Sequence, residues 1–199
     1  MNLDDCKLAI CPHCGHKKDL IRLLSGNSQN AQQWSDGKQI RPMYPKVSPV
    51  QKCPECGHFY FMSDVEIEEG NTISFQQGWL SFEDAVQAYD ELSDRSNLDK
   101  LELLTLVLTW AYNDIIRNFE SPTEEQFLIL KNIQTVNLLQ PIFKDNELIR
   151  AEINREIMNF DACIHVLENF NPAEDYVLKI KNTILFKAKE KKYSVFLIR

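Results

Sequence analysis

The sequence lacks the motifs by which most enzymes are recognised. Its six glycines nowhere form a phosphate-binding loop, and neither a G-x-S-x-G nucleophile elbow nor an H-E-x-x-H metal motif is present. Adjacent acids such as Glu124 and Glu125 are more simply explained as the first turn of a helix than as an acid–base pair. Without a convergent set of reactive residues, we expect that the protein is not an enzyme.

Long apolar runs are missing as well. The longest nearly unbroken one, residues 103–112, is too short to span a bilayer. The first residues, MNLDDCK, carry two acids where a signal peptide would carry basic charge. For a chain of 199 residues, these features predict a cytoplasmic protein with no membrane partner, in which free thiols are expected.

Positive charge is scarce in the middle of the chain. Residues 79–175 hold seven basic and nineteen acidic residues, and residues 1–78 hold eight and nine. A module that binds duplex nucleic acid would be expected to display a cationic patch. The charge distribution therefore argues against nucleic acid as a partner, and we expect a protein partner to bind among the helices of residues 98–170.

The end of the chain has the opposite charge, because residues 176–199 hold seven basic residues and one acid. This Lys-rich end could bind an anionic membrane surface or RNA. Binding to RNA would make the protein a nucleic-acid-associated factor. Positive charge late in a final helix also complements the helix dipole and the acidic helices of the same chain. We favour the second interpretation, and we expect residues 193–198 to dock on the body of the protein.

What the sequence does have is one short pattern in two copies, CPHCG at residues 11–15 and CPECG at residues 53–57. Two cysteines three apart can bind one ion only if the backbone between them turns sharply. The proline presets φ for such a turn, and the glycine can take the positive φ that other residues resist. Backbone amides in the turn can also point at the sulfurs and stabilise their charge. The pattern predicts a metal site whose ligands are Cys11, Cys14, Cys53 and Cys56.

Four thiolates suit one tetrahedral zinc ion, and a rubredoxin-like iron centre is the alternative. Because four cysteines fill the site, no position stays open for water or substrate, and the metal is expected to be structural. His13, His16 and His58 are then expected to be solvent-facing and not ligands. Cys6 and Cys163 are left over, and Cys163 is predicted to be a small buried apolar residue.

Short strands and turns are predicted around the cysteine pairs. Residues 8–10 and 20–24 predict a hairpin around the first pair, and Asp36-Gly37 predicts a two-residue hairpin turn between Trp34 and Ile40. Alternation over residues 58–69 predicts one half-buried strand. Its expected inner face is Phe59, Phe61, Val65 and Ile67, and its expected outer face is Tyr60, Asp64, Glu66 and Glu68.

Aromatic residues are frequent in this part of the chain. They could form a base-stacking platform, but a domain of under about 80 residues needs them for its own core, and we favour the core. The set is Trp34, Tyr44, Phe59, Tyr60 and Phe61.

Helical patterns begin after residue 79. Ser81 is the predicted cap of the first helix, and Ser121 is the predicted cap of the third, with Pro122 at its first position. The predicted helices cover residues 81–94, 98–119, 122–139, 145–158, 160–169 and 173–191. Short loops between them favour an antiparallel bundle. Residues 146–172 are similar to one tetratricopeptide-type hairpin, but Ile153 and Arg155 stand where its first helix usually has a small residue, and no second copy follows.

The whole chain resembles uncharacterised bacterial proteins in which a CPxCG pair encloses a segment like WSDGKQIRPMYP and an acidic helical domain follows. The match covers residues 11–15, 34–45, 53–57 and the helical remainder. The resemblance implies an architecture and no activity. We predict an α+β multidomain protein, with a small β zinc ribbon at residues 1–72 and an all-α, tetratricopeptide-like bundle at residues 79–199. Its predicted function is that of a non-catalytic, zinc-binding interaction or scaffold module. The alternative is a nucleic-acid-associated factor that uses the ribbon and the Lys-rich C-terminal helix.

Overall fold

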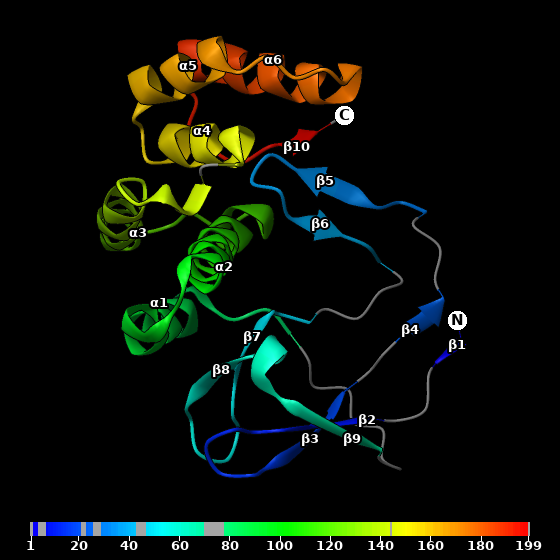
Figure 1. Cartoon of the computed structure of the whole chain (residues 1–199). Helices are drawn as coiled ribbons and strands as arrows, with labels where there is room; N and C mark the ends of the chain where they lie inside the picture. The colour runs from blue at the N-terminus through cyan, green and yellow to red at the C-terminus, as the bar shows by residue number, and fades with distance from the viewer. Residues whose placement is uncertain are drawn as a thin grey trace. The chain divides into compact units, whose positions relative to one another are not determined.

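The computed structural model describes residues 2–3, 7–20, 23–25, 29–42, 47–69, 78–143 and 145–198. Small β-sheets that carry the cysteine pairs come first, and six α-helices follow (Figure 1), which confirms the predicted α+β class. By its internal contacts the chain forms two compact units. We call Met1–Ala31 with Ile40–Ser96 the cysteine unit, and Gln32–Gln39 with Asn97–Arg199 the helical unit. The domain bounds 1–72 and 79–199 stay predictions.

The strands are short and pair antiparallel. β2 (Lys7–Ile10) lies between β3 (Lys17–Leu20) and β9 (Glu66–Glu69), β7 (Val50–Lys52) pairs with β8 (Phe59–Phe61), and β1 (Asn2–Leu3) pairs with β4 (Leu23–Ser25). β5 (Gln32–Trp34) lies between β6 (Gln39–Ile40) and β10 (Leu197–Ile198). The predicted hairpin around the first cysteine pair is therefore present, although its second strand begins at Lys17 and not at residue 20.

The prediction of one continuous strand over residues 58–69 is wrong. β8 ends at Phe61, a 3-10 turn (Met62–Asp64) follows, and β9 pairs in a different sheet. The Met62 N–H donates to the Pro49 carbonyl at 2.9 Å, so the chain leaves the first sheet there. Because the two halves have different neighbours, all three residues of β8 are buried, whereas all four residues of β9 are exposed.

The aromatic residues of β8 belong to the core of the cysteine unit. Phe59, Tyr60 and Phe61 are 2–4% exposed, so Tyr60 does not face solvent as the alternation predicted. These three side chains are too deeply buried to serve as a base-stacking platform. Tyr44 lies outside the described residues. Trp34 lies in the helical unit, where the Arg117 guanidinium is 5.0 Å from the centre of a ring of its indole.

The six helices lie close to their predicted positions. They are α1 (Phe82–Leu92), α2 (Leu98–Arg117), α3 (Glu124–Asn137), α4 (Glu147–Glu156), α5 (Phe160–Asn169) and α6 (Asp175–Lys189). By its contacts α1 belongs to the cysteine unit, where it packs on β7 and β8. Within the described residues no helix is both long enough and apolar enough to cross a membrane.

The helix caps are local in origin. The Ser81 hydroxyl accepts a hydrogen bond from the Asp84 N–H at 3.1 Å, as predicted. The predicted cap at Ser121 is wrong, because Thr123 caps α3 and exchanges hydrogen bonds with Gln126 in a capping box. The sequence carried this signal as T-x-x-Q, and Pro122 accordingly precedes the cap instead of opening the helix.

The turn between β5 and β6 is displaced by one residue from the prediction. The Gly37 N–H donates to the Trp34 carbonyl at 3.0 Å, so Ser35 and Asp36 are the central residues of the turn. Gly37 follows with φ of +80°, and a Cβ there would come within 2.9 Å of the Ile149 side chain. Glycine is therefore favoured at this position by its positive φ, whereas the end of the Ile149 side chain could move aside for a Cβ.

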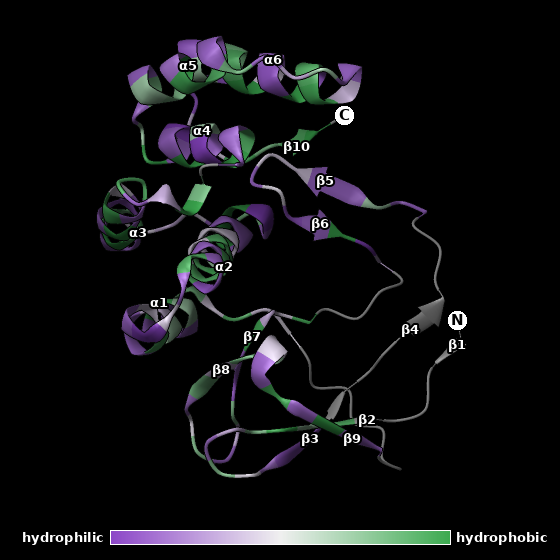
Figure 2. Cartoon of the chain, in the orientation of Figure 1, coloured by the Kyte–Doolittle hydropathy of each residue, from purple (hydrophilic) through white to green (hydrophobic). Residues whose placement is uncertain are grey.

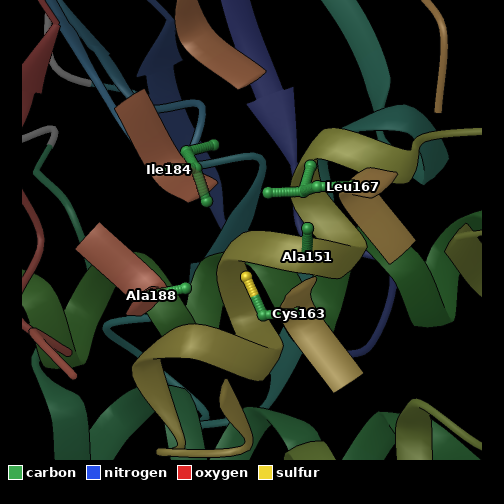
Figure 3. Close-up of a cluster of buried hydrophobic side chains, with 5 residues drawn as sticks. All are labelled: Ala151, Cys163, Leu167, Ile184 and Ala188. Atoms are coloured by element: carbon green, nitrogen blue, oxygen red, sulfur yellow. The ribbon is translucent and has the colours of Figure 1, made fainter. Parts of the chain in front are cut away.

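The last three helices pack around one apolar cluster (Figure 3). Its buried side chains are Ala151, Cys163, Leu167, Ile184 and Ala188. Ala151 of α4 is fully buried in this cluster. The tetratricopeptide-like character of these helices stays a prediction. Cys163 is fully buried, as predicted, and its burial raises the pKa of the thiol to about 12.

Candidate metal centre

The two cysteine pairs fold into turns with the same hydrogen bonds. In each turn the glycine N–H donates to the carbonyl of the first cysteine, at 3.0 Å for Gly15 and 2.9 Å for Gly57. The N–H of that cysteine donates to the carbonyl of the histidine after the glycine, at 2.9 Å in both turns. The two glycines have φ of +73° and +76°, and a Cβ at either would meet no atom within 4 Å. Their role is therefore conformational, as the motif predicted.

These turns bring four sulfur atoms together. The Sγ atoms of Cys11 and Cys56 are 3.9 Å apart, those of Cys14 and Cys53 are 3.7 Å apart, and all four lie within 4.8 Å of one another. A sulfur tetrahedron with metal–sulfur bonds of about 2.3 Å has edges of about 3.8 Å. Disulfide sulfurs would be only about 2.05 Å apart. The arrangement therefore fits a four-thiolate metal site, and the four cysteines are free thiols.

Backbone amides stabilise negative charge on the sulfur of Cys53. Burial raises the pKa of this thiol, but hydrogen bonds from the N–H groups of Cys56 and Glu55 lower it, and the result is about 6. At Cys56 the His58 N–H lowers the pKa, whereas burial and the three other sulfurs raise it to about 12. Four thiolates so close together need a cation between them to hold their charge, because each one destabilises the others.

Tyr60 closes one side of the cluster. Its ring packs against Cys11 and Cys53, with Met62 and Val65 beside it. Burial and the charge of the four sulfurs raise the pKa of its hydroxyl to about 12. The residue that the alternation pattern placed on the solvent face thus covers the candidate metal site.

The neighbouring histidines lie beside the cluster and not in it. The rings of His13 and His58 stack with centroids 4.8 Å apart, and His58 Nδ1 is 2.8 Å from a carboxylate oxygen of Glu91 in α1. Among the described residues, the only cluster able to hold a metal ion consists of the four cysteines. Cys6 lies outside the described residues.

A second polar cluster, which no sequence motif indicated, is buried in the helical unit. Asp36, in the turn after β5, is 2% exposed and accepts hydrogen bonds from Arg117 and from Asn113, the latter at 2.9 Å. Lys38 is 1% exposed and donates to Asp114 at 2.5 Å. Burial lowers the pKa of Lys38, although Asp114 opposes this. These contacts attach the hairpin to α2.

Helix α4 adds a fully buried ion pair to this cluster. Arg155 and Glu152 are both 0% exposed, and Arg155 donates to both carboxylate oxygens, through Nε at 2.7 Å. Glu156 accepts from Asn113 at 3.0 and 3.1 Å. Burial raises the pKa of Glu156 well above its ordinary value, and the nearby charges of Glu152 and Asp36 raise it further. No local pattern could predict the cluster, because its members are scattered along the chain.

The C-terminal segment docks on the helical unit, as predicted. β10 pairs with β5, Val195 is 7% exposed, and Arg155 donates to the carbonyls of Lys192 and Ser194. Lys181 is buried and donates to a backbone carbonyl at 2.6 Å. The C-terminal segment is therefore held by buried contacts. Among the lysines of residues 176–199, Lys181 in α6 points into the protein.

Comparison with known proteins identifies no relative. No family model matches the chain, and no curated protein or solved structure is significantly similar to it. The resemblance to bacterial CPxCG proteins is thus supported only at the level of architecture, by the four-cysteine cluster in small sheets followed by six helices.

Proposed function

We propose that the four cysteines bind one structural zinc ion and that the helical unit binds a protein partner. The observation that carries the first part is the close set of four sulfurs, all within 4.8 Å of one another and with two separations of 3.7 and 3.9 Å. The donor set is complete without water, and soft thiolates suit zinc. Because the site leaves no coordination position for a substrate, the proposed role of the ion is to stabilise the fold and not to catalyse a reaction.

Metal analysis of the purified chain tests the zinc proposal. We expect about one zinc per chain and a colourless protein, because zinc has a filled d shell. Cys14→Ser should lower the zinc content at least about tenfold when a competing chelator is present, since it removes a direct ligand. Cys163→Ala is the matched control and should keep its zinc. Iron in place of zinc would identify the rubredoxin-like alternative, and a metal-free, fully folded protein would refute the proposal.

The proposed partner surface lies on α3 and the turn that follows it. Leu128 and Val136 on the helix are 48% and 57% exposed, and Leu139 in the turn is 82% exposed. Exposed apolar side chains grouped in this way are typical of interaction sites. The acids Glu124 and Glu125 lie in the first turn of the same helix. A partner segment with an apolar face and basic flanks would complement this surface.

Affinity capture with surface variants tests the partner proposal. The full chain should retain a specific protein, and the double variant Val136→Glu/Leu139→Glu should lose it. Ile67→Glu, at a residue of similar exposure in β9, should not. Capture that is unaffected by the double variant would contradict the proposal. A salt titration with random RNA and DNA examines the nucleic-acid alternative, which requires affinity that falls steeply with salt.

A further inference from the structure

The outer face of α6 carries an exposed stripe of apolar, polar and charged residues. Its members recur every three or four residues and are Asp175, Leu178, Asn182, Phe186 and Lys189. Leu178 is 40% and Phe186 is 57% exposed, and they line an open hollow of about 470 Å³ with Asp175, Lys179, Asn182 and Thr183. The opposite face of the helix, with Lys181, Ile184 and Ala188, is buried. Figure 2 shows this mixture of hydrophobic and hydrophilic residues along α6.

The stripe is arranged symmetrically about Asn182, so that residues at equal distances before and after it can pair with each other in an antiparallel helix pair. Leu178 and Phe186 lie four residues before and after Asn182, and Asp175 and Lys189 lie seven residues before and after it. In an antiparallel pair of α6 helices centred on Asn182, Leu178 of one copy therefore meets Phe186 of the other. Asp175 of one copy meets Lys189 of the other, whose Nζ lies 3.9 Å from the exposed Glu168 carboxylate of its own chain. Four and seven residues are the spacings at which one face of a helix repeats.

We propose that this face binds a second copy of the chain, so that two α6 helices pack antiparallel in a two-fold symmetric dimer. A two-fold interface uses the same patch on both copies, and it therefore requires a patch that complements itself. Here the symmetry forms each contact twice, which gives two apolar pairs and two ion pairs. The antiparallel arrangement also opposes the two helix dipoles, whereas a parallel arrangement would bring acid to acid and lysine to lysine.

The expected dimer is weak. Helix α6 has 15 residues, which corresponds to a length of about 22 Å. A single helix pair of this length covers less than the roughly 800 Å² per partner that is usual for stable complexes. The dimer should therefore dissociate on dilution, and exchange between differently labelled or mutated chains should be rapid enough to follow in a mixture.

Sedimentation velocity of the full chain over a dilution series tests the proposal. We expect a concentration-dependent monomer–dimer equilibrium, and Asp175→Lys or Lys189→Asp alone should weaken the dimer at least about tenfold, because each creates two like-charge contacts. An equimolar mixture of these two variants should dimerise again, since every contact in the mixed dimer joins opposite charges. The double variant Asp175→Lys/Lys189→Asp should likewise dimerise with itself.

Lys131→Asp on α3 is the matched control and should leave the equilibrium unchanged, because it makes the same charge change outside the stripe. Recovery of dimerisation in the mixture also shows that both single variants are folded. A chain that stays monomeric at every concentration would overturn the proposal. So would a dimer that the single variants do not weaken, or a mixture that does not recover.

Discussion

Removal of the proposed zinc ion is expected to unfold the small sheets of the cysteine unit while helices α2–α6 stay folded. Among the described residues, the cluster that packs around the sulfurs has three buried side chains, Cys11, Cys53 and Tyr60, so little apolar surface is available next to the site to replace the ion. Structural zinc contributes about 10–16 kcal/mol of apparent binding free energy in zinc-finger peptides. This is comparable to the about 5–15 kcal/mol that stabilise a whole domain.

Hydrogen exchange measured with and without a strong chelator should show this effect. Amide protection should disappear from residues 7–20 and 47–69 and persist in residues 98–117 and 147–189. Cys53→Ser should have the same effect without chelator, and Cys163→Ala should not. Acidification should act in the same direction, because the thiolates must lose their protons to bind metal. Sheets that stay protected without metal would show that the apolar core suffices.

Replacement of Arg155 is expected to be the most damaging single change in the helical unit. Arg155→Met leaves Glu152 charged, 0% exposed and without its ion-pair partner, which typically costs about 3–5 kcal/mol. The carbonyls of Lys192 and Ser194 lose their donor as well. We therefore expect both a lower free energy of unfolding, measured by denaturant titration, and weaker attachment of the C-terminal segment, measured by limited proteolysis.

Two further variants separate the loss of a buried pair from the loss of a charge. In Glu152→Leu/Arg155→Met both charges of the pair are gone, and much of the stability should return because the buried Glu152 carboxylate is no longer left without a partner. Glu156 loses its 3.9 Å contact with Arg155 in both variants and keeps the hydrogen bonds from Asn113. Lys192→Met removes an ion pair with Glu190 that is largely exposed to solvent, and its effect should be below about 1 kcal/mol. Equal losses for Arg155→Met and Lys192→Met would mean that the buried pair contributes no more than a surface pair.

The candidate metal site is the part of the molecule that the sequence predicted in most detail. Each five-residue motif sets its own turn, because its hydrogen bonds join residues no more than five apart and its glycine supplies the positive φ. The helices were predictable for the same reason, since Ser81 and Thr123 cap by bonding to the third residue after them. Where prediction failed at Ser121, the correct signal lay two residues away.

Strand partners and burial were not predictable in the same way. Apolar and polar residues do alternate over residues 58–69, but the turn after Phe61 places the two halves of this segment in different sheets. Tyr60 is therefore buried and Ile67 is 54% exposed. A period of two residues says which side chains share a face, and it does not say which other strand covers that face.

Local chemistry by itself determined the cysteine turns, the positions of the six helices and the α+β class. Only the tertiary structure decided that the hairpin at residues 32–39 packs with the helical unit, that Asp36, Asn113 and Glu156 meet in one buried cluster, and that the C-terminal strand completes the sheet of β5. The physical reason is the separation along the sequence between the interacting groups. Caps and turns are satisfied by backbone groups a few residues away, whereas a buried charge is stable only beside a partner that folding brings from a distant part of the chain.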